Sequence, residues 1–181
     1  SKKIYIFEKS KKNITKIKKI NSKLKVLDKL DEKISDVDFI ILCTPMSQYE
    51  KIIPYLNKFL TKKSIITDIG STKKNIIKIK NKKLKNSLSW ILSHPITGSE
   101  VSGPEHGSKN LFKKKWCIVI KDKNKIKTKK LIAFWKKLGS RVILMDPIKH
   151  DRIFSVTSHL PHLIAYNLIK TAQDFQKKQK T

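Results

Sequence analysis

Histidine and glycine, two residue types that active sites use often, are concentrated in one part of this chain. All five histidines lie between His94 and His162, and three of the five glycines lie between Gly98 and Gly107. Because both types are otherwise scarce, this clustering predicts a functional site. A neutral imidazole has an ordinary pKa of about 6.5 and accepts a proton or a hydrogen bond at neutral pH, so acid–base chemistry is indicated.

Three short segments contain the polar residues that such a site would need. In chain order they are residues 68–73 (Asp-Ile-Gly-Ser-Thr-Lys), residues 93–105, which begin Ser-His-Pro-Ile-Thr-Gly-Ser-Glu, and residues 158–162 (Ser-His-Leu-Pro-His). The first two follow predicted strands, and open α/β sheets bind ligands at the carboxyl ends of parallel strands. The first also precedes a predicted helix, whose free amides favour an anionic or dipolar ligand. We therefore expect the first two segments at one edge of a parallel sheet.

The elements that must position these segments alternate between strand and helix. Apolar, β-branched runs predict strands at residues 3–8, 37–44, 64–69, 90–93, 115–121 and 141–145. Apolar residues at helical spacing predict helices at residues 10–20, 46–60 and 128–138, and a further helix is expected after the turn at Gly70. Ser10 is expected to cap the first of these helices, and Ser71 the helix after Gly70. This alternation is typical of α/β proteins and predicts a Rossmann-like, doubly wound parallel sheet.

A domain boundary is predicted near Pro147, since no further strand follows it. Residues 1–147 are expected to form an NAD(P)-binding Rossmann-like domain, and residues 148–181 the start of an all-helical domain whose helix is interrupted at Pro161. No Gly-x-Gly-x-x-Gly turn is present, yet the first strand ends in Glu8, as the second strand of a dinucleotide-binding unit does. We therefore expect the first strand and its glycine turn upstream of this sequence, and most of the helical domain beyond it.

The net charge of +28, from 42 basic and 14 acidic residues, suggests a nucleic-acid partner at first sight. Only Arg141 and Arg152 are arginine, although arginine is the residue best suited to contact guanine and phosphate. The lysines are also spread over the whole chain, so we expect a solvated lysine-rich surface and no specific nucleic-acid partner. Such a surface still attracts anionic small molecules. A basic nucleic-acid-binding module is the alternative from a different functional class.

The sequence predicts neither a membrane protein nor a secreted one. No apolar run approaches the roughly 20 residues of a membrane-spanning helix, and charges interrupt residues 1–31 throughout. We expect a cytoplasmic protein with no membrane partner. Cys43 and Cys117 lie far apart in apolar runs and are predicted to be buried thiols of a reducing compartment.

In this order and at these separations, the three segments resemble those of the prephenate/arogenate dehydrogenase family of tyrosine biosynthesis. Residues 150–152 (His-Asp-Arg) belong to the same resemblance, which covers essentially the whole chain. The family implies oxidative decarboxylation of prephenate to 4-hydroxyphenylpyruvate, or of arogenate to tyrosine, with hydride transfer to NAD(P). It also implies a homodimer formed through the helical domain. Another dehydrogenase of the same two-domain plan, such as a β-hydroxyacid dehydrogenase, is the alternative among enzymes.

The resemblance implies roles for individual residues. His94 is the expected catalytic acceptor for the substrate's C4 hydroxyl, and Ser71 is expected to bridge this histidine and the nicotinamide, with a purely helix-capping role as its alternative. The substrate-binding residues implied are Ser99, Glu100, His159 and His162. For Glu100 the alternative is to order its loop only. A half metal site at His159 and His162 is the other interpretation, but we expect no metal, because no Cys or carboxylate pair accompanies them.

The cofactor-binding residues expected are Glu8, Thr44, Pro45, Gly70 and Ser71. An acid at the end of the second strand accepts hydrogen bonds from the adenosine ribose, which favours NAD. Lys9, Lys11 and Lys12 keep NADP as an alternative, since cations there would hold a 2′-phosphate. His106 and His150 are interpreted as solvated or structural residues.

Overall fold

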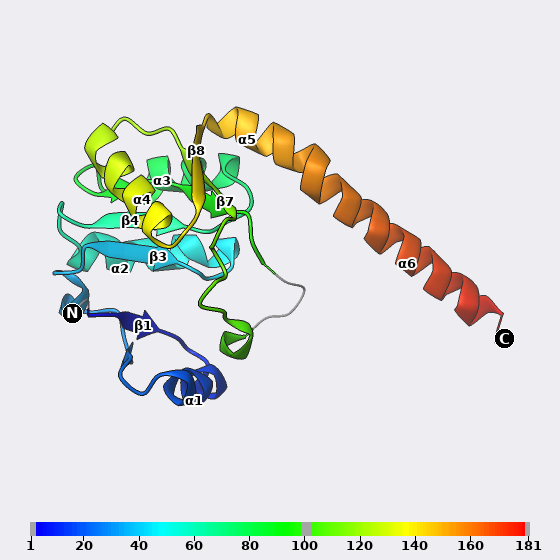
Figure 1. The fold of residues 1–181 in the computed structure, drawn as a ribbon, viewed down its shortest axis with the longest axis horizontal. Helices are drawn as coiled ribbons and strands as arrows, with labels where there is room; N and C mark the ends of the chain where they lie inside the picture. The colour runs from blue at the N-terminus through cyan, green and yellow to red at the C-terminus, as the bar shows by residue number, and fades with distance from the viewer. Residues whose placement is uncertain (1–2, 99–102, 180–181) are drawn as a thin grey trace.

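The computed structural model describes residues 3–98 and 103–179, whose arrangement is shown in Figure 1. The strands are β1 (Tyr5–Phe7), β2 (Lys25–Leu27), β3 (Phe39–Leu42), β4 (Ile65–Asp68), β5 (Ser89–Trp90), β6 (Ser93–Pro95), β7 (Trp116–Ile120) and β8 (Arg141–Met145). The helices are α1 (Lys11–Ile20), α2 (Tyr49–Phe59), α3 (Lys74–Lys83), α4 (Lys125–Lys137), α5 (Pro147–Phe154) and α6 (Leu160–Lys178). Short 3-10 turns are η1 (Glu32–Ile34), η2 (Met46–Gln48) and η3 (Pro104–His106), and η4 (Ser155–His159) is a π turn.

The parallel strands β1 and β2 are connected by α1 at one end of the molecule (Figure 1). Ser10 caps α1 as predicted, since its Oγ accepts a hydrogen bond from the Asn13 amide at 3.3 Å. β2 is absent from the predicted elements, because this strand has only 3 residues and begins with an exposed lysine. The acid-ended first strand and the capped helix after it are therefore both present in the predicted order.

The parallel strands β3, β4 and β5 form the central sheet in that order, with α2 and α3 as the crossover helices. Successive residues of β4 belong to opposite faces. Ile66 is buried in one cluster with Ile53 of α2, whereas Ile65 is buried in another with Leu131 of α4. Since side chains alternate along a strand, helices cover both faces of this sheet, as predicted for a doubly wound α/β fold.

The pairing of β6 with β7 differs from the predicted all-parallel sheet. Only Ile91 and Leu92 separate β5 from β6, which then pairs antiparallel to β7, with His94 opposite Ile118. β7 and β8 pair in parallel. A parallel connection needs a crossover of a dozen or more residues, usually a helix, but the described part of the β6–β7 connection contains only the turn η3. The second predicted segment therefore begins inside a strand of a mixed sheet.

The chain after β8 is a nearly continuous helix that extends away from the sheet (Figure 1). The predicted interruption at Pro161 is wrong, because Pro161 lies in the first turn of α6. The irregularity is instead the π turn η4, which ends at His159, two residues before this proline. A proline has no amide hydrogen to donate, and the first turn of a helix tolerates that loss. Within residues 3–98 and 103–179, no helix has the length and apolar character needed to cross a membrane.

The two cysteines differ in exposure. Cys117 is buried as predicted, in the cluster beneath α4. The predicted burial of Cys43 is wrong, because this residue is exposed directly after β3 ends. The apolar run that contains Cys43 continues past the end of the strand, where the chain has already left the sheet.

Gly139 follows α4 at a position that requires glycine. Its φ is +91°, and a Cβ there would lie 3.1 Å from the Lys113 Cα. We predict that Gly139→Ala lowers the free energy of unfolding by about 1–2 kcal/mol, since a left-handed backbone costs an L-residue that much. Urea unfolding measures the change. Gly98→Ala is the control, because a Cβ at Gly98 meets nothing within 4 Å, and equal stability of the two variants would contradict the prediction.

Candidate active site

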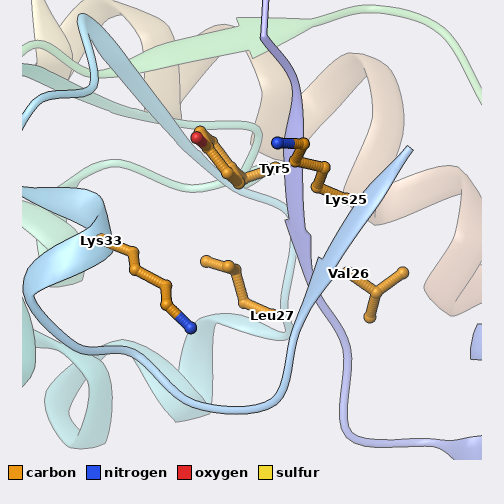
Figure 2. A pocket seen from close by; sticks show the side chains of 5 residues that line it. All are labelled: Tyr5, Lys25, Val26, Leu27 and Lys33. Carbon is orange, nitrogen blue, oxygen red and sulfur yellow. The ribbon is translucent and has the colours of Figure 1, made fainter. Parts of the chain in front are cut away.

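Two hollows in the surface differ in the side chains that line them. The first, of about 520 Å³, lies beside β1 and β2, and none of its five lining residues is a histidine or a carboxylate (Figure 2). They are Tyr5, Lys25, Val26, Leu27 and Lys33. The second, of about 890 Å³, is called the cleft below; its polar lining residues include His94, Ser108, Asn110, Thr157, Ser158 and His162. Because two predicted site histidines meet there, we place the candidate active site in the cleft.

His94 is linked to α5 by a chain of hydrogen bonds. Its Nδ1 lies 2.9 Å from His150 Nε2, and His150 Nδ1 lies 2.8 Å from Asp151 Oδ1. The Phe154 ring completes the cluster, with its centroid 4.9 Å from that of His94 and 4.6 Å from that of His150. His150 is fully buried, so of its two interpretations, solvated or structural, the solvated one is wrong. It is a direct partner of the predicted catalytic histidine.

Asp151 also caps α3. Its Oδ1 accepts a hydrogen bond from the Lys73 amide and its Oδ2 accepts one from the Lys74 amide, each at 2.8 Å. The prediction that Ser71 caps this helix is wrong, because the cap position is Lys73, two residues further on. A carboxylate from a segment 78 residues later in the chain caps the helix instead. This contact joins the middle of α5 to the strand–helix junction after β4.

A fully buried ion pair contacts the strand that contains the predicted catalytic histidine. Lys73 Nζ donates to Asp68 Oδ2 and to the Ser93 carbonyl, both at 2.7 Å. Asp68 also accepts hydrogen bonds from the Gly70 amide at 3.0 Å and the Trp90 indole at 3.2 Å. Burial raises the pKa of Asp68 and lowers the pKa of Lys73, and their mutual attraction opposes both shifts. Three donors around the carboxyl group favour the ionised pair.

The surroundings of His94 keep its imidazole neutral. Burial, followed by the charge of Lys73 and of two neighbouring histidines, lowers the pKa of His94 to about 3. Burial also lowers the pKa of His150, although its hydrogen bond to Asp151 opposes this shift. A neutral imidazole keeps one ring nitrogen unprotonated and able to accept a hydrogen bond. The site therefore supplies an acceptor at neutral pH.

The structure brings together only some of the predicted substrate-binding residues. His162 is exposed on α6 and lines the cleft together with His94. His159 is half-buried at the end of the π turn, and its charge contributes to the low pKa of His94. Ser99 and Glu100 lie outside the described residues. In the part of the chain that the structure describes, no group of three or more His, Cys, Asp or Glu side chains is placed to hold a metal ion.

The predicted cofactor-binding residues lie where parallel strands end, which is where open α/β sheets bind ligands. They are Glu8 after β1, Thr44 and Pro45 after β3, and Gly70 and Ser71 after β4. The Glu8 carboxylate accepts hydrogen bonds from the Ser10 amide at 2.8 Å and the Asn13 side chain at 3.4 Å. A Cβ on Gly70 would lie 2.8 Å from Met46 Sδ, so a side chain at this turn would require the Met46 side chain to shift. Ser71 is half-buried and is not among the described lining residues of the cleft.

Three residues of the site have no role in the sequence-based prediction: Lys73, His150 and Asp151. All three belong to segments that carry the family resemblance, and this membership was the sequence signal that could have identified them as site residues. The sequence does not show their contacts, because the two hydrogen-bonded histidines are 56 residues apart. A histidine beside an aspartate is compatible with a solvated surface or with a buried pair, and only the packing of α5 decides between these.

Comparisons with known proteins place the chain among dehydrogenases. The family profile described as "Prephenate dehydrogenase, nucleotide-binding domain" matches residues 1–144, and that described as "Prephenate dehydrogenase, dimerization domain" matches residues 146–181. The chain is 31% identical to the cyclohexadienyl dehydrogenase of Zymomonas mobilis over 182 residues, which is 98% of this chain and 61% of that protein. It is 28% identical to the prephenate dehydrogenase of Lactococcus lactis over 145 residues, 79% of this chain and 40% of that protein.

Solved structures agree with these matches. The prephenate dehydrogenase of Aquifex aeolicus superimposes with a TM-score of 0.84 at 30% identity, covering 94% of this chain and 62% of that one. A second structure of that enzyme, in complex with hydroxyphenyl propionate and NAD+, gives a TM-score of 0.83 at 31% identity, covering 94% of this chain and 60% of that one. The chain therefore spans 61% of the length of the Zymomonas mobilis protein and 62% of the Aquifex aeolicus chain.

The buried pair of Lys73 and Asp68 gives a prediction about stability. Lys73→Met or Asp68→Asn alone leaves one buried charge without its partner, which costs about 3–5 kcal/mol. We expect the free energy of unfolding to fall less in the double variant than the sum of its falls in the two single variants, because the double variant contains no uncompensated charge. Urea unfolding of the wild type, the two single variants and the double variant measures this coupling. If the two single losses of unfolding free energy simply added up in the double variant, the Lys73 and Asp68 charges would not stabilise each other.

Proposed function

The chain belongs to the prephenate dehydrogenase family, and we propose that the protein catalyses the NAD-dependent oxidative decarboxylation of prephenate or arogenate. Prephenate would give 4-hydroxyphenylpyruvate, and arogenate would give tyrosine. Family membership favours this reaction over that of a β-hydroxyacid dehydrogenase. The observation that carries the proposal is the neutral imidazole of His94 in a cleft that His162 also lines.

The proposed reaction needs little acid–base power, because the substrate ring becomes aromatic. The C4 hydrogen leaves with its electron pair, the bond between the ring and its carboxylate breaks, and that second electron pair enters the ring as CO2 departs. When bound, NAD+ supplies the acceptor for the hydride. The proton that leaves the C4 hydroxyl returns to the same oxygen, so no net proton is released. The protein must hold that proton briefly and keep the reacting atoms aligned.

Each predicted site residue has a role in this proposal. His94 accepts the hydrogen bond of the C4 hydroxyl through its unprotonated ring nitrogen. His162, on the helical side of the cleft, donates to a carboxylate or ring group of the substrate, and His159, Ser99 and Glu100 complete the substrate-binding set. Ser71 bridges His94 and the nicotinamide. Support for the last role comes from the capping of α3 by Asp151, since the Ser71 hydroxyl is not needed as the cap.

We propose NAD as the cofactor, with Glu8, Thr44, Pro45, Gly70 and Ser71 around it. Glu8 supports this choice, because a carboxylate has several lone pairs, and those not used by Ser10 and Asn13 can accept from ribose hydroxyls. The nucleotide-binding profile and the NAD+ complex of the Aquifex aeolicus enzyme also support it. NADP is the alternative, since Lys9, Lys11 and Lys12 lie next to Glu8 in the chain.

We also propose that residues 148–181 begin a helical domain through which two copies of the protein form a dimer. Support comes from the dimerization-domain profile and from the many exposed apolar side chains of this segment. They include Val156, Leu160, Leu163, Ile164, Tyr166, Leu168, Ile169 and Phe175. Apolar surface of this extent favours a partner.

We propose the cytoplasm as the location of the protein, because the proposed reaction uses the cellular NAD pool.

The reaction itself is tested with the full-length gene product, prephenate or arogenate, and NAD+ or NADP+. We expect reduced cofactor to accumulate with one of the two substrates and CO2 to be released in equal amount. NAD+ should be preferred, because the Glu8 carboxylate repels a 2′-phosphate. A strong preference for NADP+ would refute the role of Glu8. No reduction with either substrate, together with salt-dependent binding of duplex DNA, would favour the nucleic-acid-binding alternative.

The role of His94 is tested by His94→Asn. We expect kcat to fall by about 10²–10⁴-fold, the usual contribution of a positioned acid–base group, with little change in the circular dichroism spectrum. His106→Gln is the matched control, because His106 is exposed on η3 and is absent from the cleft lining. Near wild-type turnover of His94→Asn would remove His94 from the catalytic role.

A further inference from the structure

The hydrogen bonds of Asp151 determine where the proton of His150 lies. Burial acts to raise the pKa of Asp151, but hydrogen bonds from the Lys74 amide, the His150 ring and the Lys73 amide lower it overall. The carboxylate is therefore ionised at neutral pH, and an ionised carboxylate only accepts hydrogen bonds. His150 Nδ1, 2.8 Å from Asp151 Oδ1, must donate and hence bears the proton of the neutral ring.

The same reasoning extends from His150 to His94. A neutral histidine with its proton on Nδ1 has an unprotonated Nε2, which can only accept. His94 Nδ1 lies 2.9 Å from that Nε2 and must therefore donate to it. A neutral His94 with its proton on Nδ1 has an unprotonated Nε2. Among residues 3–98 and 103–179, the only hydrogen-bond partner of the His94 ring is His150, on Nδ1, so Nε2 is the nitrogen left to accept from a substrate.

We propose that His150 and Asp151 are positioning residues that fix His94 in the tautomer whose Nε2 accepts the proton of the substrate hydroxyl. The inference rests on the proposed function. As Nε2 of His94 takes that proton, the Nδ1 proton of His94 stays in its hydrogen bond to His150 Nε2, and the ionised Asp151 stabilises the charged ring through His150. When the substrate ring becomes aromatic, the transfer reverses and the proton returns to the substrate oxygen. Atoms and charges therefore balance without a further reactant.

Packing holds this chain of hydrogen bonds in one geometry. His150 is fully buried, and its ring lies against Phe154 with centroids 4.6 Å apart. Asp151 is fixed by the two amides of α3. The other ionisable groups that act on the two rings are Lys73, Asp68 and His159. The Lys73 cation disfavours lasting positive charge on either ring, so a proton taken from the substrate is held only transiently.

The tautomer is measured directly by nitrogen NMR of the histidine rings in the full-length gene product. Protonated and unprotonated ring nitrogens have well separated shifts, and the couplings to ring hydrogens identify each nitrogen. At neutral pH, without ligand, we expect both His94 and His150 to have a proton on Nδ1 and a bare Nε2. A proton on Nε2 of His94 in the wild-type protein would overturn the proposal, whatever the activity.

Two variants of His150 separate positioning from packing. His150→Phe keeps an aromatic ring beside Phe154 but removes both hydrogen bonds, so the His94 tautomer should no longer be fixed. We expect kcat to fall by about 10²–10⁴-fold with little change in KM, since His150 is absent from the cleft lining. His150→Gln retains one acceptor and one donor and should keep kcat within about tenfold of the wild type. His106→Gln controls for the loss of a histidine.

The outcomes distinguish this inference from the proposed function. Equal losses of kcat in His150→Phe and His150→Gln would overturn the tautomer-fixing role, because the hydrogen bonds that Gln retains would then not preserve activity. If the proposed function were wrong, the wild-type protein would not turn over prephenate or arogenate, while the ring-nitrogen pattern would remain as expected. Should His150→Phe fail to fold, the wild-type spectrum and the Gln variant still decide.

Discussion

The two hydrogen bonds from the first amides of α3 to Asp151 connect the nucleotide-binding layer to the long C-terminal helix. Because Asp151 is held there, the adjacent His150 is buried against β6 and reaches His94. The imidazole of His94 is thus positioned from two directions, by the pairing of β6 with β7 and by the ring of His150. If the contact between Asp151 and α3 were lost, both the orientation and the tautomer of His94 would be free to change.

Lys73 contributes to the same region electrostatically. Its ammonium group neutralises Asp68 in a fully buried pair, and its charge contributes to the low pKa of His94. A buried ion pair adds little net stability, since desolvation offsets most of the attraction. We infer that its value lies in the charge distribution near the cleft, where its cation adds to burial, the larger cause, in keeping two imidazoles neutral. On the outside, a net charge of +28 would attract an anionic substrate such as the proposed one toward the molecule.

The sequence predicts well those features that depend on neighbouring residues. Long apolar runs identify β3, β4, β7 and β8, and Ser10 identifies the start of α1, because burial and capping act within a few residues. Features set by distant contacts are predicted poorly. Local propensity favours Ser71 as a cap, but a carboxylate 78 residues from Lys73 takes that role. The antiparallel turn from β6 to β7 and the burial of His150 likewise depend on how the helices pack, which no local pattern contains.

The low pKa of His94 suits the proposed chemistry for a physical reason. As hydride leaves C4, the hydroxyl oxygen becomes that of a protonated carbonyl group, which is a strong acid. A weak base therefore takes the proton readily at the moment when charge develops, and not before. Once CO2 departs, the same oxygen becomes a phenolate and a far stronger base than a buried imidazole. The proton then returns to it, so an acceptor of low pKa serves both halves of the reaction, whereas a strong base would hold the proton and delay the second.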